Sequence, residues 1–482
     1  MQAERYIAAA DIGTSKIALC VAQVNGDDVQ VIYYRETPSR GMRYGSVFAP
    51  KQTADALREA IGAAEDELKI RILQLVVGLP RYNVVQEIGS ASINRDNPEE
   101  SCITSEEISD LKRLAIDSYP IDDSTKEKIY GAVAQSFSAD DEITGASEND
   151  IVGVPASVLE GNFKIFIGAR RPVSNIDIML NEIGIAPARK LFTPNATAQA
   201  VLTDSEKENG VALIEIGAGV TSVTIFTNGL LRHYSSIPFG GKVITSDIKY
   251  VCSLTEPLAE NIKLAFGACL PDKLSTLGEK ILRINDDESG SYETVPVSNL
   301  SRIITARMNE ITEAVLYQIQ QSGYADKLRN GVVITGGGAN LRNLPMMIRD
   351  MSGYTVRVGY PRTQVFSSGG CPGATETSAA TVIGMILEAR KDRHLNCILE
   401  ARSPAPATET TAVTDSMKAS EPSGKEQEMF GEGEIEIVQS EGKKKKEEKK
   451  VLWKKFGLGS KIKKGLEGAF DNTVGGLFDD MQ

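Results

Sequence analysis

Clustered cysteines, histidines and long apolar runs are missing from this sequence of 482 residues. Its six cysteines are scattered and form no CxxC pair or Cys/His cluster, so we expect neither a zinc site nor a redox pair. The only two histidines, His233 and His394, leave little room for histidine-based catalysis. No run of about 18 apolar residues occurs, which argues against a membrane-spanning helix. The first residues lack a basic region followed by an apolar one, so no secretory signal is expected.

Positive charge is also scarce, except in one segment. The net charge of −12 argues against a general nucleic-acid binder. Eleven lysines and two glutamates lie between Lys443 and Lys464, a local charge of +9, so the rest of the chain carries −21. An acidic body with a basic tail indicates that the tail is an interaction segment.

The chain divides by its patterns into a long α/β part and a polar tail. Residues 1–400 alternate strand-like and helix-like segments with short glycine-rich turns, which predicts an α/β fold. Within them, residues 82–170 have the texture of a compact α+β insertion. Residues 401–450 are rich in Ser, Pro, Thr, Glu and Lys, and their composition predicts a disordered linker. Residues 451–482 form an apolar, lysine-studded segment.

One sequence unit occurs twice, about 200 residues apart. In each copy a strand ends in a carboxylate, Asp11 or Glu215, and a turn of small residues leads into a returning strand and an Asn-Gly hairpin. Glycine in such a turn lets the backbone approach a phosphate, and consecutive N–H groups form an anion-binding nest. The predicted phosphate contacts are Gly13, Thr14, Ser15 and Lys16 in the first loop, and Gly217, Ala218, Gly219 and Thr221 in the second.

The two carboxylates are the candidate catalytic residues. We expect Asp11 to hold Mg²⁺, through water, or to orient an attacking water, and Glu215 to face the same space. A third glycine segment ends in Gly336, Gly337 and Gly338, where a buried strand is expected to meet a helix N-terminus. One such hairpin alone is often only a strand end with a tight turn, but three glycine sites are a more specific signal.

Two phosphate hairpins followed by a glycine-rich segment resemble the actin/Hsp70/sugar-kinase superfamily. Within it the chain most resembles the bacterial FtsA cell-division family. The resemblance rests on three segments: Thr37-Pro38-Ser39-Arg40-Gly41-Met42, the stretch Leu231-Arg232-His233 to Ile248, and the helix Glu260-Asn261-Ile262-Lys263. It implies ATP and Mg²⁺ as cofactors, with Glu260, Lys263 and the three glycines on the nucleoside.

The same resemblance implies an actin-like two-lobed ATPase fold. Its parts are the first lobe at 1–81, 171–208 and 370–400, the second lobe at 209–369, and a 1C-like subdomain at 82–170.

Several side chains have an ordinary alternative role. Lys16 either meets a phosphate or is a solvated turn lysine, and Glu260 and Lys263 can form a simple i,i+3 ion pair. Asn195 and Gln199 either activate water or are ordinary polar helix residues. Family members often carry Asp where this chain has Glu215. The extra methylene would reposition a metal or a water, so at most slow ATP hydrolysis is expected.

Residues 451–482 place six apolar side chains on one face of an ideal helix, which predicts an amphipathic helix that lies in a membrane interface. The lysines would meet anionic lipid, although six glycines weaken the helix in water. The alternative is a helix that docks on protein. The candidate membrane contacts are Leu452, Trp453, Phe456, Ile462, Leu466 and Phe470.

The resemblance implies a peripheral protein on the cytoplasmic face of the cell membrane at the division site. It would bind ATP, polymerise, anchor the tubulin-like division protein FtsZ and recruit later division proteins, without binding nucleic acid. The alternatives within the superfamily are a pilus-assembly ATPase and a small-molecule kinase. An Hsp70-like chaperone would need a peptide-binding sheet domain that residues 401–482 do not provide.

Overall fold

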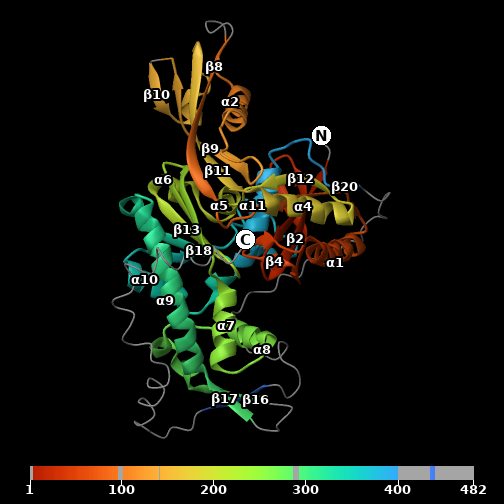
Figure 1. Cartoon of the computed structure of the whole chain (residues 1–482), viewed down its shortest axis with the longest axis vertical. Coiled ribbons are helices and arrows are strands. Elements are labelled where there is room, and N and C mark those ends of the chain that lie inside the picture. The colour runs from red at the N-terminus through yellow and green to blue at the C-terminus, as the bar shows by residue number, and fades with distance from the viewer. Residues whose placement is uncertain (1–3, 96–100, 141, 286–291, 400–434, 440–482) are drawn as a thin grey trace, which may run out of the picture.

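Two five-stranded sheets of the same topology form the centre of the molecule (Figure 1). The computed structural model describes residues 4–95, 101–140, 142–285, 292–399 and 435–439. In each sheet three antiparallel strands continue into two parallel ones, in the orders β3-β2-β1-β7-β12 and β15-β14-β13-β18-β19. We call the part built on the first sheet lobe 1 and the part built on the second sheet lobe 2.

The strands of both sheets have these bounds. Lobe 1 has β1 Arg5–Ile12, β2 Lys16–Asn25, β3 Asp28–Pro38, β7 Gln74–Gly78 and β12 Ala186–Leu191. Lobe 2 has β13 Val211–Ile216, β14 Thr221–Thr227, β15 Leu230–Ile237, β18 Val332–Thr335 and β19 Val356–Val358. Short strand pairs are β4 Met42–Arg43 with β5 Ser46–Val47, and β6 Arg71–Ile72 with β20 Ile398–Leu399.

The central strand β13 is buried along its whole length, and β1 is buried at Ile7–Ala10 and Ile12, as in strands covered on both faces. The predicted Asn-Gly hairpins close β2–β3 and β14–β15. Their glycines, Gly26 and Gly229, have φ values of 61° and 72°, which a residue without a side chain adopts readily. The strand–turn–strand repeat predicted from the sequence is therefore present in both lobes.

Helices cover both sheets and fill the space between them. Helices α5 (Pro194–Val201) and α11 (Ala380–Ala389) cross between the sheets, where Gly384 packs so tightly that a Cβ would lie 2.1 Å from the Ala196 carbonyl oxygen. Helices α1 (Pro50–Leu68) and α4 (Arg170–Ile183) lie on the outer side of lobe 1. The other helices of lobe 2 are α6 Asp204–Asn209, α7 Gly241–Val251, α8 Glu256–Phe266, α9 Val297–Gln321 and α10 Leu344–Ser352.

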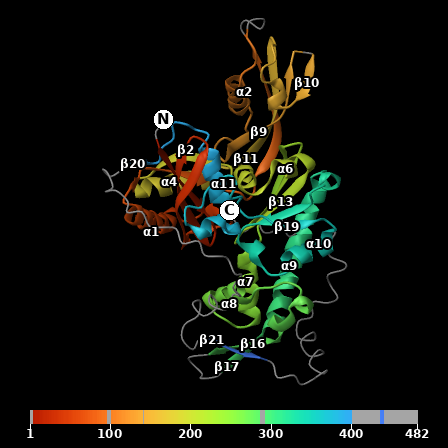
Figure 2. The same cartoon turned by 180° about the vertical axis from the view of Figure 1, so that it is seen from behind.

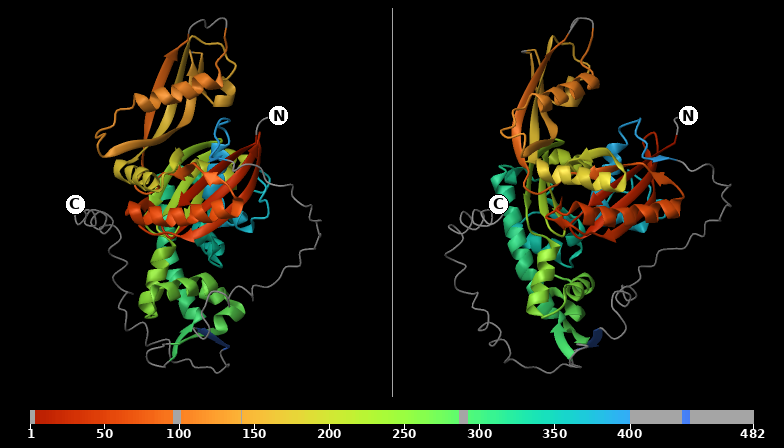
Figure 3. Two further views of the ribbon diagram at one scale, coloured as in Figure 1. Left: turned by 90° about the vertical axis from the view of Figure 1, so that its right-hand side faces the viewer. Right: turned by 45° about the vertical axis from the view of Figure 1, so that its right-hand side comes forward.

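A separate four-stranded antiparallel sheet, the insert, projects from one end of the molecule (Figure 3). It has its own apolar core and one long helix, α2, whose N-cap Thr104 forms a capping box with Glu107. The insert comprises β8 Val85–Asn94, α2 Ser105–Asp117, β9 Glu127–Ala139, β10 Ile143–Ala146, α3 Glu148–Ile151 and β11 Val158–Ala169.

The insert docks on lobe 2, although it lies within the sequence of lobe 1. The backbone N–H of Tyr234, on β15, donates to Gln86 Oε1 at 3.0 Å, and the Gln86 amide nitrogen lies 2.8 Å from His233 Nδ1. The Gln135 side chain donates to the Leu231 carbonyl oxygen at 3.0 Å. Strands β8 and β9 are therefore tied to the edge strand of lobe 2.

The opposite end of the molecule is formed by part of lobe 2 that we call the lower module (Figure 2). It contains α7, α8 and the antiparallel sheet β17-β16-β21. Strand β21 (Ile435–Gln439) lies inside the range predicted as a disordered linker, and it pairs with β16 (Lys280–Asn285), opposite β17 (Tyr292–Pro296). Composition alone missed it because the strand is only five residues long, with apolar residues within an acidic stretch.

Helices α7 and α8 are separate because the chain turns at Ser253 with φ of 52°. The rest of the predicted linker and all predicted membrane contacts lie outside the described residues. Within the described ranges, no helix combines the length and apolarity needed to cross a bilayer.

Short 3₁₀ turns connect several of these elements. They are Pro271–Lys273, Ser275–Glu279, Ala325–Lys327, Gly337–Asn340, Pro372–Thr375 and Thr377–Ala379.

Candidate nucleotide site between the lobes

The two predicted phosphate loops have the same backbone geometry. The Gly13 N–H donates to the Lys16 carbonyl oxygen at 2.9 Å, and the Gly217 N–H donates to the Val220 carbonyl oxygen at 2.9 Å. A Cβ at either glycine would lie 2.9 Å from that same oxygen, closer than real Cβ atoms come. Both turns therefore depend on glycine for the same steric reason.

The loops of the two lobes touch each other. A Cβ at Gly219 would lie 2.6 Å from Thr14 Oγ1, so the second loop approaches the first as closely as a glycine allows. The Thr14 hydroxyl is held in place because it accepts a hydrogen bond from the Gly45 N–H at 2.9 Å. Thr14 and Gly219 thus mark the line where the two loops meet.

The two predicted carboxylates, Asp11 at the end of β1 and Glu215 on β13, are joined by Arg81. The guanidinium Nη1 donates to Glu215 Oε1, and Nη2 lies 3.7 Å from Asp11 Oδ1. All three side chains are at most 19% exposed. The Thr381 hydroxyl also donates to Glu215 Oε1, at 2.9 Å. Both predicted carboxylates therefore belong to one buried polar network between the lobes.

No sequence pattern used above singles out Arg81. It follows β7 by three residues, and β7 pairs in parallel with β1, so both strands deliver their last residues to the same edge of the sheet. A sequence signal for Arg81 would therefore be a basic residue just after β7, because β7 pairs in parallel with β1, the strand that carries Asp11.

Burial and charge act against each other in this network. Burial raises the pKa of Asp11, and the nearby Arg81 guanidinium opposes that effect only in part. Burial disfavours the charge on Arg81, but the carboxylates of Glu215 and Asp11 outweigh it and raise the pKa of Arg81. The guanidinium therefore stays charged at every physiological pH.

Lys16 does not point at the other loop in this structure. Its Nζ forms a 2.6 Å ion pair with Glu36 on β3. Burial alone would raise the pKa of Glu36, but Lys16 and two hydroxyl hydrogen bonds lower it. The structure therefore pairs Lys16 with Glu36 beside the first loop, a role that neither of the two sequence-based alternatives included.

Glu260 and Lys263 form the i,i+3 ion pair that the sequence allowed, with Nζ 2.7 Å from Oε2. Lys263 is buried and also donates to the Gly241 carbonyl oxygen at 3.0 Å and to the Thr245 hydroxyl at 2.8 Å. Burial lowers the pKa of Lys263, while Glu260 opposes this shift. The Gly241 N–H donates to the Gly217 carbonyl oxygen at 2.9 Å. The Glu260–Lys263 ion pair therefore supports the second loop through the start of α7.

The third glycine segment lies beside the second loop but does not open a helix directly. Gly336 has φ of 84°, and a Cβ there would lie 2.6 Å from the Ile216 carbonyl oxygen. The following residues, Gly337–Asn340, form a 3₁₀ turn, and α10 begins only at Leu344. The predicted helix N-terminus after the glycines is therefore wrong, because the chain makes a short turn against the end of β13 first.

The two candidate water-activating residues sit on α5. The Gln199 side chain donates to Glu388 on α11 at 2.7 Å, whereas Thr197, two residues earlier on the same helix, lies next to Glu215 and Thr381. Positions two apart face nearly opposite sides of a helix, so Gln199 is directed away from the carboxylate network. Asn195 is half-buried on this helix.

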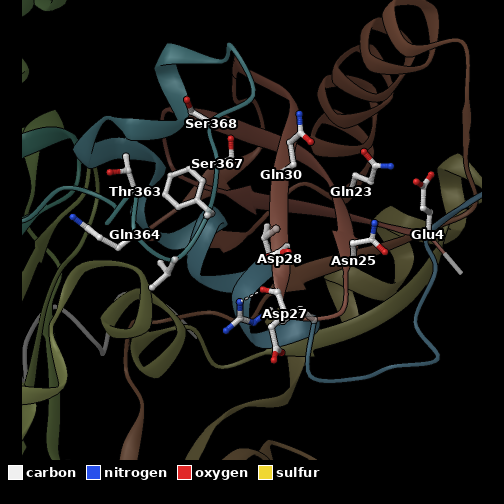
Figure 4. A pocket seen from close by; sticks show the side chains of 14 residues that line it. Glu4, Gln23, Asn25, Asp27, Asp28, Gln30, Thr363, Gln364, Ser367 and Ser368 are labelled. Carbon is white, nitrogen blue, oxygen red and sulfur yellow. Dashed lines mark hydrogen bonds between the residues drawn. The ribbon is translucent and has the colours of Figure 1, made fainter. Parts of the chain in front are cut away.

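A cavity of about 890 Å³ lies elsewhere, at the far end of the β2–β3 hairpin (Figure 4). Its walls include Glu4, Asp27 and Asp28 but one basic residue, Arg390, whose guanidinium donates to the Asp27 carbonyl oxygen at 2.7 Å. Its acidic lining repels phosphate, and it lies roughly 30 Å along β2 from the first loop. It is not an alternative nucleotide phosphate site.

The fit of Mg²⁺ to this network is poor while Arg81 holds it. Among the residues that the structure describes, no group of three or more His, Cys, Asp or Glu side chains is placed to bind a metal ion. Asp11 and Glu215 converge on a guanidinium, which contacts one oxygen of each carboxylate. A magnesium ion bound by these carboxylates would compete with the positive charge of Arg81.

Two sheets of equal topology, with facing glycine hairpins and crossing helices between them, define a two-lobed protein of the actin-like ATPase fold. The solved structure of a PilM–PilN type IV pilus biogenesis complex shares this fold, with a TM-score of 0.54 and 15% identity over 81% of this chain and 99% of that one. The predicted fold class is thereby confirmed.

Sequence comparison identifies the family. The cell division protein FtsA of Neisseria meningitidis serogroup B is 31% identical over 410 residues, covering 84% of this chain and 93% of that protein. The Bacillus subtilis protein of the same description is 28% identical over 355 residues, 73% of this chain and 78% of its own length. A family model described as cell division protein FtsA matches residues 212–384. The chain belongs to the FtsA family of cell division proteins, as its sequence motifs suggested.

Proposed function

We propose that this chain binds ATP between its two lobes and anchors the FtsZ ring to the cytoplasmic face of the cell membrane at the division site. The observation that carries the nucleotide part is the pair of matching glycine hairpins that meet at Thr14 and Gly219. Each hairpin presents backbone N–H groups in the manner of an anion-binding nest. Phosphates between them would contact both lobes at once.

The nucleoside end of ATP is assigned to the neighbouring glycine turn and to α8. The turn at Gly336, Gly337 and Gly338 lies beside the second loop, and the Glu260–Lys263 pair supports that loop from the other side. We propose slow hydrolysis at most, because Arg81 and Thr381 both donate to Glu215 Oε1 and tie that oxygen to groups other than an attacking water.

Anchoring is assigned to residues 451–482, joined to the body by the segment from residue 400. We propose that this segment lies in the membrane interface, that ATP-bound chains polymerise, and that the polymer recruits later division proteins. Family membership and the basic, apolar composition of the segment support this assignment.

Co-sedimentation with anionic liposomes tests this function. We expect the full chain to pellet with the vesicles, and a chain that ends at Lys450 to stay in solution, while both bind ATP with the same affinity because the lobes are intact in both. Pelleting of both chains, or of neither, would contradict the assignment of residues 451–482. Transfer of phosphate from ATP to a small hydroxyl compound would instead point to a kinase.

A further inference from the structure

The hairpin of β4 and β5 reaches the junction of the two phosphate loops, although it belongs to neither. Its tip is the two-residue turn Tyr44-Gly45. The Gly45 N–H donates to Thr14 Oγ1 of the first loop at 2.9 Å, and a Cβ at Gly45 would lie 3.8 Å from Val220 Cγ2 of the second loop. A third segment of the chain therefore borders the place proposed for phosphate.

The backbone of this hairpin tip is strained. Tyr44 and Gly45 have φ values of 47° and 67°, and a two-residue hairpin loop with positive φ at both positions is a type I′ turn. Glycine and asparagine adopt this conformation readily, whereas a tyrosine in it is an outlier. Strain of this kind persists only where the surrounding structure fixes it, and it is concentrated at active sites and ligand clamps.

Two neighbours hold the Tyr44 ring in place. Its centroid lies 5.7 Å from that of the Tyr82 ring, and the Arg43 guanidinium lies 5.3 Å from the Tyr44 centroid in a cation–π contact. Tyr82 directly follows Arg81, the residue that joins the two carboxylates. An asparagine at position 44 would suit the turn better but would lose both ring contacts. The strained tyrosine therefore fixes the hairpin tip beside the carboxylate network.

The base of the hairpin is fixed as well. The N–H groups of Phe48 and Ala49 both donate to the Gly41 carbonyl oxygen at 2.9 Å, just before α1 begins. The buried Thr53 hydroxyl on α1 donates to the Arg40 carbonyl oxygen at 2.9 Å. Because its base and its tip are both held, the hairpin presents its last N–H group to the first loop in one direction.

We propose that the Tyr44-Gly45 tip is a positioning element of the nucleotide site, which orients the Thr14 hydroxyl so that it donates its proton to a phosphate of ATP. The inference rests on the proposed ATP site and adds the group that prepares one of its donors. The hydroxyl oxygen accepts the Gly45 N–H, so its own proton points away from Gly45. Gly219 of the second loop lies on another side of the hydroxyl, and the proton is thereby directed to the space that the two loops border.

Such an arrangement strengthens the contact with phosphate in two ways. A donor that is already oriented binds an anion better than one that must first be ordered. A hydroxyl whose oxygen accepts a hydrogen bond is also a better donor, because linked hydrogen bonds polarise one another. The contact between Thr14 and phosphate should therefore weaken when the hairpin tip is released, even though Thr14 itself is unchanged.

The affinity of the purified full chain for radiolabelled ATP, measured by equilibrium dialysis in excess Mg²⁺, tests this inference. Tyr44→Asn suits the turn but removes the ring. We expect it to bind ATP about fivefold more weakly, part of the effect of one hydrogen bond to a charged group, with equal or higher resistance to urea. Tyr44→Phe keeps the ring and should bind ATP like the wild type. Tyr360→Asn, at an exposed tyrosine after β19, is the matched control and should change neither property.

A double-mutant cycle with Thr14→Val shows whether the tip acts through the Thr14 hydroxyl. Thr14→Val removes the hydroxyl and should weaken ATP binding by about tenfold. Adding Tyr44→Asn to Thr14→Val should weaken it no further. A second loss of about fivefold in this background overturns the inference, as does wild-type affinity of either single variant.

Hydrogen exchange of the nucleotide-free chain, measured by mass spectrometry, gives a readout that needs no ATP. Tyr44→Asn should speed exchange in residues 42–48, and Tyr44→Phe should leave it unchanged. Equal exchange in Tyr44→Asn and the wild type would show that the ring does not hold the tip, which overturns the inference and leaves the ATP site standing. Absence of ATP binding by the wild type overturns the proposed ATP site itself.

Discussion

At the residue scale, Gly219 is a position where the contact between the two loops leaves no room for a side chain. A methyl group there would lie 2.6 Å from Thr14 Oγ1, which is held by its hydrogen bond from Gly45. We expect Gly219→Ala to lower the free energy of unfolding by about 1–3 kcal/mol, the usual cost of overpacking, and to weaken ATP binding. Urea unfolding and ATP titration of the same samples measure both effects.

Gly62 is the control for this substitution. It lies inside α1, and a Cβ there would have no atom within 4 Å. Gly62→Ala should therefore stabilise the chain by about 0.5–1 kcal/mol, through the higher helix propensity of alanine. If both substitutions destabilise equally, the close contact between the loops is not the cause.

His233 makes the stability of the chain depend on pH. Burial, and then the nearby Lys164, lower the pKa of His233 from 6.5 to about 4. A folded-state pKa below the unfolded value means that the stabilisation is complete above pH 6.5 and is lost as the pH falls toward 4. Protonation would also place an N–H of the ring against the Gln86 side chain, 2.8 Å away.

We therefore expect the free energy of unfolding to fall between pH 6.5 and pH 4, and this slope to be smaller in His233→Gln. Urea denaturation across this range measures it. The exposed His394→Gln should keep the wild-type slope. A slope that is the same in His233→Gln and the wild type would show that other groups cause the pH dependence.

Local patterns in the sequence predict two of the site residues, Asp11 and Glu215, but no local pattern predicts Arg81. Asp11 and Glu215 stand out because each precedes a glycine turn in a repeated unit. Arg81 has no motif of its own, and its partner Glu215 lies 134 residues away in sequence. Only the pairing of β7 beside β1 brings it to the carboxylates.

At the scale of elements, predictions succeed where the signal is local and strong. The hairpins at Asn25-Gly26 and Asn228-Gly229 depend on neighbouring residues alone, and both are present. The 3₁₀ turn after Gly336 and the break at Ser253 depend on how these segments pack, so residue patterns did not reveal them.

Strand β21 is the element that composition placed in a disordered linker, and its pairing can be tested directly. Proline has no N–H and disrupts a strand, so replacing Ile437 and Val438 together by proline should release β21 from β16. We expect faster hydrogen exchange at Ile281–Ile284 on β16, measured by mass spectrometry.

Ala412→Pro, in the predicted linker, is the control and should leave exchange on β16 unchanged. Equal exchange on β16 in the double proline variant and the wild type would show that β21 does not protect this edge.

At the scale of the whole molecule, the two-lobed fold was implied by the family resemblance, which rests in part on the repeated hairpin unit. The docking of the insert does not follow, since the partners of Gln86 on β15 lie 147 and 148 residues away. Such contacts depend on how the finished parts fit together, which no local pattern encodes.

The docking of β21 also determines how the body can sit on a membrane. Roughly 12 residues separate Gln439 from Val451, a span of at most about 40 Å, so the lower module must stay near any surface that holds residues 451–482. On liposomes, a fluorophore at Lys273→Cys in the lower module should be quenched by lipid-borne quencher more than one at the exposed Cys102 of the insert.

The Lys273→Cys chain carries Cys102→Ser, and both chains carry Cys371→Ser, so that each has one accessible thiol. Stronger quenching at Cys102 would show that the insert, and not the lower module, faces the membrane. The double proline variant of β21 should reduce the difference between the two labels.

The hydrogen bonds between the insert and β15 couple the movement of the insert to that of lobe 2. The insert is connected by sequence to lobe 1 but is held by Gln86 and Gln135 to the edge strand of lobe 2. A rotation of lobe 2 that opens the space around the phosphate loops must either break these bonds or swing the insert with it. Because β10 and α2 lie at the end of the insert that projects away from the two lobes, a small rotation of lobe 2 becomes a large displacement at this tip (Figure 1). A neighbouring molecule that contacts this tip would respond to the relative orientation of the lobes without touching the phosphate loops.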